Sequence, residues 1–108
     1  MENALRAIAE PNRRRILELV AGGERSAGEI AAEFSITRPA VSQHLTVLKG
    51  AGLVSERREG TKRHYSVRVE GFDDLRAFLE TFWGDGLERL KLAAEHEEGR
   101  RRRGRRPA

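Results

Sequence analysis

Apolar residues recur at helical spacing in four successive segments of the first half of the chain. Side chains three or four positions apart share one face of an α-helix, so each set predicts an amphipathic helix with one apolar stripe. The segments begin near residues 3, 11, 26 and 37. Their stripes are Leu5 and Ile8, then Ile16, Leu17 and Val20, then Ile30, Ala31 and Phe34, and finally Val41, Leu45 and Leu48.

Residues with special backbone roles mark where these helices begin and end. Pro11 suits the first turn of the second helix, where its missing N–H costs nothing. Ser26 and Glu29 have the S-x-x-E spacing of a capping box at the start of the third helix. Thr37 is the expected N-cap of the fourth helix, and Gly52 is the expected residue just beyond its end. These signals support the helices independently of hydrophobic spacing.

Period-two patterning replaces helical spacing after Gly52. Leu53 and Val54 begin one strand, residues 59–61 form a turn, and residues 64–69 form the return strand. On that return strand Tyr65, Val67 and Val69 are expected to share a face. The pattern predicts a β-hairpin.

Residues 72–97 return to helical spacing with a long apolar stripe. Two glycines at 84 and 86 interrupt this segment, so we expect a kink or two consecutive helices there. Residues 1–98 are therefore assigned to one domain, and the low-complexity residues 99–108 to a disordered Arg-rich tail.

The predicted order is four helices, a hairpin and a last helix (ααααββα). This is a mainly α fold with a small β-hairpin, and the order is typical of a winged helix-turn-helix. The third and fourth helices form the helix-turn-helix pair, and the hairpin forms the wing.

Charge is segregated along the chain, although the net charge is only +4. Residues 37–69 hold seven Lys or Arg against two Glu, residues 70–98 hold nine acids against three basic residues, and residues 100–106 hold six Arg. Positive charge concentrated on one module and a tail favours binding of a polyanion through a defined face.

Several classes of protein are disfavoured by the composition. The chain has no cysteine, which removes disulfides, thiolate metal sites and thiol nucleophiles. It has no secretory signal pattern at its start and no run near the ~18 apolar residues of a membrane span, so we expect a cytoplasmic protein without a membrane partner. Scattered acids and three isolated histidines form no recognisable catalytic constellation, so we expect no enzyme.

The polar side of the fourth helix carries residue types that read DNA. Arginine binds guanine and glutamine binds adenine through two hydrogen bonds each, and short hydroxyls reach phosphates or base edges. The candidate contacts are Thr37, Arg38, Ser42, Gln43 and His44. The plainer alternative is a solvated face of an amphipathic helix, and for His44 it is a structural hydrogen-bonding role.

The predicted wing is rich in basic residues near its tip. Arg58, Lys62 and Arg63 are the candidate contacts to phosphates or the minor groove. Only some of them can contact DNA together, because alternate strand residues share a face. The alternative is a hairpin whose charges serve solubility.

The first and last helices carry apolar residues beyond the needs of a small core. An isologous dimer interface would bury them. The candidate interface residues are Leu5, Ile8, Leu75, Leu79, Phe82, Trp83, Leu87 and Leu90. The alternative is that Phe82 and Trp83 pack inside the monomer.

Two segments carry the first four helices, the caps and the hairpin described above: ALRAIAEPNRRRILELV and SAGEIAAEFSITRPAVSQHLTVLKGAGLVSERREGTKRHYSV. With the motifs A-x-x-x-P-x-R-R-R-I-L, P-A-V-S-Q-H-L-x-V-L and A-G-L-V followed by R-x-G-x-x-x-x-Y, residues 3–97 resemble the ArsR-type winged-helix transcriptional regulators. The resemblance implies a homodimeric repressor that binds an inverted repeat in promoter DNA, with the first and last helices as the dimer interface.

Two departures separate this chain from the metal-sensing members of that family. Many members sense metals through cysteines of the third helix, and this chain has none. Others use Asp and His pairs in the last helix, where this chain has only His96, which together with Asp85 supplies too few ligands for an ordinary site. The sequence is closer to the metal-independent branch, which includes autorepressors, and we expect no metal and no cofactor. His64 and His96 are expected to be surface residues.

Three functions remain open from the sequence. The leading one is a dimeric, sequence-specific DNA-binding repressor. The second is a protein-interaction module that docks a partner through its last helix, and the third is a non-specific nucleic-acid binder driven by the Arg tail.

Overall fold

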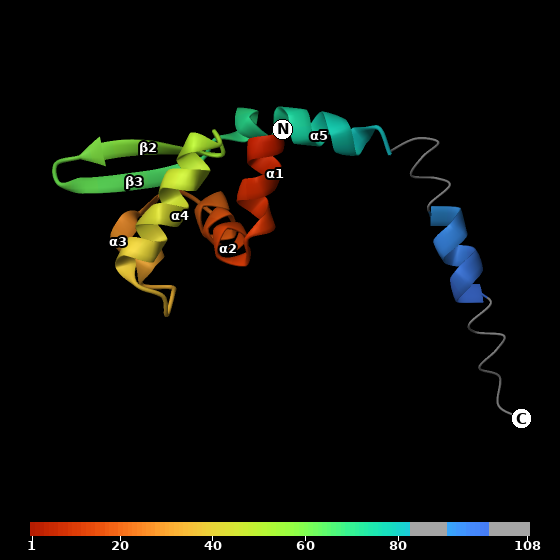
Figure 1. Cartoon of the computed structure of the whole chain (residues 1–108), viewed down its shortest axis with the longest axis horizontal. Helices are drawn as coiled ribbons and strands as arrows, with labels where there is room; N and C mark the ends of the chain where they lie inside the picture. Colours follow the sequence, from red (N-terminus) through yellow and green to blue (C-terminus); the bar gives the residue numbers. More distant parts are fainter. Residues whose placement is uncertain (83–90, 100–108) are drawn as a thin grey trace, which may run out of the picture. The chain divides into compact units, whose positions relative to one another are not determined.

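The helix-turn-helix and the wing lie in the first part of the chain (Figure 1). The structure, a computed structural model, describes residues 1–82 and 91–99, and the chain divides into two units at residues 75 and 76. The elements of the first unit are α1 (Glu2–Ala9), α2 (Pro11–Ala21), β1 (Arg25–Ser26), α3 (Ala27–Ala31), α4 (Arg38–Gly50), β2 (Val54–Glu59), β3 (Lys62–Val67) and a 3-10 turn, η1 (Val69–Phe72).

The expected capping residues lie at the helix ends that the sequence predicts. The Ser26 Oγ accepts from the Glu29 N–H at 3.1 Å, and the Glu29 carboxylate accepts from the Ser26 N–H at 3.1 Å, which completes the capping box of α3. The Thr37 Oγ1 accepts from the Ala40 N–H at 3.3 Å at the start of α4. Gly52 has a φ of +75°, the left-handed conformation that follows many helix ends.

One hydrophobic core joins α1–α4 to the base of the wing. The predicted stripe of α4 is buried, with exposed fractions of 1%, 2% and 0% for Val41, Leu45 and Leu48. The remaining members are Ala4, Ala7, Ile16, Val20, Ile30, Leu53, Val54 and Tyr65. The predicted buried stripe is therefore confirmed for α4, and Ile16 and Val20 of α2 and Ile30 of α3 are buried as expected. α1 buries Ala4 and Ala7 instead of Leu5 and Ile8, and α3 ends at Ala31, so Phe34 packs against the core from beyond that helix.

The sheet has three strands in the order β1-β3-β2, all antiparallel. Glu59 pairs with Lys62, so the wing turns through two residues, Gly60 and Thr61, and Gly60 has a φ of +61°. β1 was not predicted, because two residues are too short to show a period-two pattern.

The end of the hairpin differs from the prediction. β3 ends at Val67, and Val69 lies in the 3-10 turn with 67% of its surface exposed, so it does not continue the face of Tyr65 and Val67. Phe72, expected in the stripe of the last helix, packs against the core instead.

The last helical region is described in part. α5 spans Asp73–Glu80, and residues 91–99 are helical. The expected interruption at 84–86 lies outside the described residues, and so does the Arg-rich stretch 100–108. None of the described helices is long and apolar enough to span a membrane.

Candidate nucleic-acid interface

The outer face of α4 presents polar side chains away from the core. Arg38, Ser42 and Gln43 are exposed, whereas Val41 and Leu45 point to the opposite side and are buried. Thr46 is also exposed, and its hydroxyl donates to the Ser42 carbonyl at 3.0 Å. Four of the five predicted contacts, Thr37 included, therefore lie at the exposed side or start of this helix.

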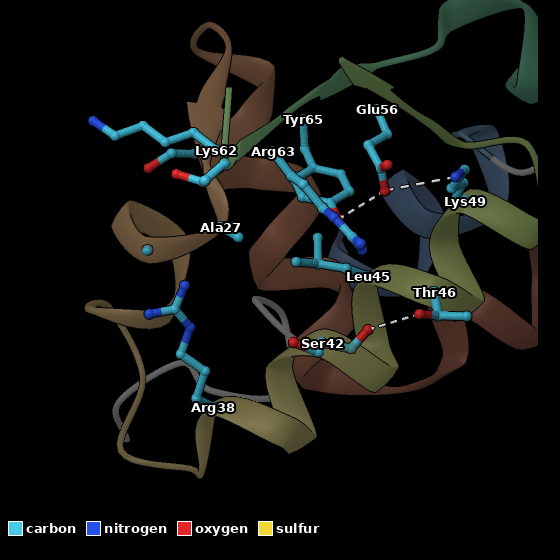
Figure 2. A pocket seen from close by; sticks show the side chains of 13 residues that line it. Ala27, Arg38, Ser42, Leu45, Thr46, Lys49, Glu56, Lys62, Arg63 and Tyr65 are labelled. Carbon is cyan, nitrogen blue, oxygen red and sulfur yellow. Dashed lines mark hydrogen bonds and ion pairs between the residues drawn. The ribbon is translucent and has the colours of Figure 1, made fainter. Parts of the chain in front are cut away.

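A groove of about 500 Å³ separates this face of α4 from the wing (Figure 2). The side chains that border it include Arg38, Ser42, Thr46 and Lys49 from α4 and Lys62 and Arg63 from β3. Figure 2 shows Arg38 extending toward the start of α3, where a Cβ placed on Gly28 would lie 3.9 Å from the Arg38 Nη2. The basic side chains of α4 and of the wing thus face a common space.

The three predicted wing contacts are brought together at the hairpin tip. Arg58 and Arg63 are paired across the ladder and share one face, whereas Lys62 pairs with Glu59 on the other face. All three nevertheless border a small hollow of about 270 Å³ at the turn. The tip therefore gathers three cationic side chains around one hollow.

Arg57 is basic but has partners within the protein. Its guanidinium donates to both carboxylate oxygens of Glu24, at 3.1 and 2.7 Å, and to Glu59 at 3.3 Å. The hydrogen bonds to Glu24 raise the pKa of Arg57, and the hydrogen bond from Arg57 lowers the pKa of Glu24. This pairing ties the middle of β2 to the loop before β1.

His64 lies beside these two carboxylates rather than on the open surface. Its side chain is 17% exposed, with the Nδ1 4.0 Å from Glu24 and the Nε2 3.5 Å from Glu59. The expectation that His64 is a plain surface residue is wrong, because β3 is the central strand of the sheet and the Glu24 and Glu59 side chains lie beside the His64 ring.

Glu56 is a residue of the groove that the sequence analysis did not single out. Its side chain is 11% exposed; its carboxylate accepts from the Tyr65 hydroxyl at 3.0 Å and lies 3.5 Å from the Lys49 Nζ and 3.8 Å from the Arg58 Nε. Burial raises the pKa of Glu56, but the Tyr65 hydrogen bond and the charges of Lys49 and Arg63 outweigh burial and leave the pKa lowered. The sequence signal that could have identified Glu56 is its position in the hairpin, where it lies directly opposite Tyr65.

His44 is turned away from the exposed face of α4. Its side chain is 18% exposed; its Nδ1 lies 3.4 Å from the Arg13 Nη1 and 3.8 Å from the Glu10 Oε2, both at the start of α2. It follows Val41 by three residues and so borders the buried stripe. This placement favours the structural role for His44 over the base contact.

The predicted dimer residues differ in exposure. Leu79 and Phe82 are 46% and 48% exposed, and Phe78, which was not predicted, is 44% exposed and stacks edge-on against Phe82 with ring centres 5.4 Å apart. Leu5 and Leu75 are half-buried. Ile8 packs against the core of its own chain, which argues against its predicted place in the dimer interface. The other three candidates, Trp83, Leu87 and Leu90, lie outside the described residues.

No candidate metal centre was found in the part of the chain that the structure describes. Groups of three or more His, Asp or Glu side chains in ligating proximity are absent among residues 1–82 and 91–99.

Comparison with known proteins gives consistent matches. The family described as bacterial regulatory protein, arsR family, matches residues 10–56. The transcriptional repressor SdpR of Bacillus subtilis is 38% identical over 80% of this chain and 96% of its own. The HTH-type transcriptional regulator Rv2034 of Mycobacterium tuberculosis is 45% identical over 80% of each chain.

A solved structure matches the fold as well. The homodimeric winged helix-turn-helix DNA-binding domain Mb0332 of Mycobacterium bovis, a possible ArsR-family regulator, has a TM-score of 0.62 at 35% identity over 74% of each chain. These matches confirm the predicted winged helix-turn-helix and the resemblance, and they are to transcriptional regulators rather than enzymes.

Proposed function

Because the chain belongs to the ArsR family of bacterial regulatory proteins, we propose that it is a homodimeric transcriptional repressor that binds an inverted-repeat operator in promoter DNA. The observation that carries the proposal is the exposed face of α4 with Arg38, Ser42 and Gln43, bordered by the cationic groove and wing tip. The side chains of that face are those that read base edges, and the wing cations suit the flanking phosphates.

In the proposed complex α4 enters the major groove. Arg38 donates to a guanine and Gln43 binds an adenine, each worth about 1–3 kcal/mol of discrimination. Thr37 and Ser42 contact phosphates or base edges near the start of α4. Arg58, Lys62 and Arg63 contact the backbone beside the groove, and two half-sites lie about one helical turn, ~34 Å, apart.

Dimerisation and repression have separate support. The Mb0332 domain is homodimeric by its description, and this chain exposes Phe78, Leu79 and Phe82 on its last helical region. Exposed aromatic and aliphatic side chains of this size favour burial against a second copy. SdpR is named as a transcriptional repressor, and repression is proposed here on that similarity.

The test is fluorescence anisotropy with duplex DNA from upstream of the protein's own gene, beside a scrambled duplex, at two salt concentrations. The variants are Arg38→Ala with Gln43→Ala, and as a matched control Arg15→Ala with Glu33→Ala, an exposed pair on α2 and in the turn after α3. We expect the wild type and the control to prefer the upstream duplex by about a hundredfold or more. The Arg38/Gln43 variant should lose that preference and keep weak, salt-sensitive binding.

If wild type shows no preference for the upstream duplex, a pool of random duplexes is selected for binding, and failure to enrich any sequence overturns sequence-specific recognition. Tail-driven non-specific binding predicts that truncation after Glu98 abolishes binding, whereas the proposed function predicts only weaker binding with a shallower salt dependence. A protein-interaction module predicts that the Arg38/Gln43 variant behaves like wild type in every assay.

A further inference from the structure

Arg13, at the start of α2, connects three helices through one guanidinium. Its Nε donates to the Ala7 carbonyl at 2.7 Å and its Nη2 to the Arg6 carbonyl at 3.2 Å, both at the end of α1. Its Nη1 lies 3.4 Å from the His44 Nδ1 on α4. A planar guanidinium with five N–H donors is suited to hold several acceptors in fixed relative positions.

Glu10 completes the same cluster from the junction between α1 and α2. Its carboxylate accepts from the Arg13 N–H at 2.9 Å and lies 3.8 Å from the His44 Nδ1. The His44 side chain is 18% exposed and that of Glu10 31%. The cluster is therefore partly shielded from water, where hydrogen bonds to charged groups hold geometry more firmly than at an open surface.

The hydrogen-bond pattern assigns a role to each ring nitrogen of His44. Arg13 can only donate, so its Nη1 forms this hydrogen bond with the tautomer of His44 whose Nδ1 carries no proton. The Arg13 hydrogen bonds also satisfy carbonyls at the end of α1 that have no partner within the helix. The orientation of α4 is thus linked to that of α1 through two side chains.

We infer that Arg13 and His44 are positioning residues that set the orientation of α4 relative to α1, and thereby the presentation of Arg38 and Gln43 to DNA. The inference rests on the proposed function. The family resemblance implies that α1 contributes to the dimer interface, so this link would set where the two copies of α4 stand with respect to the two half-sites. Bidentate base contacts depend on orientation, whereas phosphate contacts tolerate small rotations.

The test compares four single variants with wild type in full-length protein. His44→Leu removes the acceptor at similar volume, and His44→Asn places an amide oxygen where the Nδ1 lies. Arg13→Gln removes the link from the other side. Arg14→Gln is the matched control, because Arg14 also donates to a carbonyl of α1, that of Ile8 at 2.6 Å, and no contact from Arg14 to α4 is recorded among the described residues.

Affinity is measured for the selected operator and for a scrambled duplex over a range of salt, together with the dimer dissociation constant and thermal unfolding. We expect His44→Leu and Arg13→Gln to lose about tenfold in operator affinity. Affinity for the scrambled duplex, the salt slope and the dimer constant should stay near wild type, and His44→Asn and Arg14→Gln should stay within about twofold of wild type.

Three results would overturn the inference. Unchanged operator affinity in His44→Leu and Arg13→Gln removes any positioning role. A salt slope reduced by about 0.9 indicates a direct phosphate contact instead. Equal loss on both duplexes with a lower melting temperature indicates a purely structural role. Absence of operator preference in wild type is a different outcome, because it contradicts the proposed function itself. If His44→Leu does not fold, the operator affinity of Arg13→Gln decides whether the positioning role holds.

Discussion

The Tyr65 hydroxyl donates a 3.0 Å hydrogen bond to the Glu56 carboxylate across the wing. The two residues are register partners on β3 and β2, so their side chains emerge on the same face. That carboxylate also lies 3.5 Å from the Lys49 Nζ near the end of α4. The wing is thereby joined to the helix that we propose reads the DNA.

Removing this hydrogen bond should destabilise the protein modestly. Tyr65→Phe keeps the buried ring and deletes only the hydroxyl, so we expect a loss of about 1 kcal/mol. For a domain of this size that corresponds to a melting temperature lower by about 4 °C or more, measured by circular dichroism. An unchanged melting temperature would show that the Glu56 contacts with Lys49 and Arg58 hold the wing without Tyr65.

Stability should fall in acid because of Glu56 and Glu24. The pKa of each carboxyl lies below its ordinary value of 4.5 in the folded protein. A carboxyl whose pKa is lowered by folding stabilises the folded protein at pH values above its pKa in the unfolded chain. This stabilisation is lost as the pH falls through the pKa of the carboxyl in the folded protein. We expect the melting temperature to decline from about pH 5 toward pH 3. The decline should be smaller in Glu24→Gln with Glu56→Gln, and an identical decline would mean that other carboxylates dominate.

Glu56 should also restrain non-specific DNA binding. Its negative charge lies among the cations of the groove, where it repels phosphates and pairs with Lys49 and Arg58. We expect Glu56→Gln to bind a scrambled duplex about fivefold more tightly at low salt. The salt slope should also become steeper by about 0.9 for each additional phosphate contact. The control is Glu59→Gln, which removes a wing carboxylate that pairs with Arg57; equal effects of both variants would contradict a special role for Glu56.

Gly71 is required by a close backbone approach. A Cβ at this position would overlap the Gly52 carbonyl oxygen and lie 2.7 Å from its carbonyl carbon. Because the neighbour is backbone, we expect Gly71→Ala to cost about 3 kcal/mol or more in urea denaturation. Gly50→Ala is the control, since no atom lies within 4 Å of the new Cβ, and it should be neutral or stabilise α4 by up to about 1 kcal/mol. Similar losses in both variants would refute the steric explanation.

Phe78 and Phe82 should be needed for the dimer. Both rings are nearly half exposed in the single chain. Replacing both by serine should shift the protein to monomer at micromolar concentration in sedimentation velocity, and operator affinity should fall because two half-sites are no longer held together. Val69→Ser, at a position 67% exposed in the 3-10 turn, is the control. A dimer that persists in the Phe variant would place the interface elsewhere.

Local signals account for the part of the site that the sequence predicted. The stripe of Val41, Leu45 and Leu48 and the N-cap Thr37 define where α4 begins and which face is buried. A helix has a fixed period, so the opposite face, with Arg38 and Gln43, follows directly. The wing turn was predicted at residues 59–61, and the structure limits it to Gly60 and Thr61, with the left-handed backbone at Gly60 that glycine favours.

The errors and omissions share a different cause, namely contacts between residues distant in the chain. The position of His44 on α4 makes it a candidate DNA contact, but Arg13, 31 positions away, holds it beside α2. Arg57 is one of the basic residues of the wing, but Glu24, 33 positions away, pairs with it. No periodicity or capping rule contains such partners, because they depend on how the helices and the sheet pack.

Local signals along the chain were sufficient to predict the order of the helices, the hairpin and the face of α4 that carries Arg38 and Gln43. They were sufficient because backbone propensity, capping and hydrophobic period act over a few residues. The tertiary structure alone decided which charged groups pair inside the protein and which remain available at the groove and wing tip. The hydrogen-bond and ion-pair partners of a side chain are set by the packing of separate elements. Glu56, for example, lies close enough to pair with Lys49 only when the wing packs against α4.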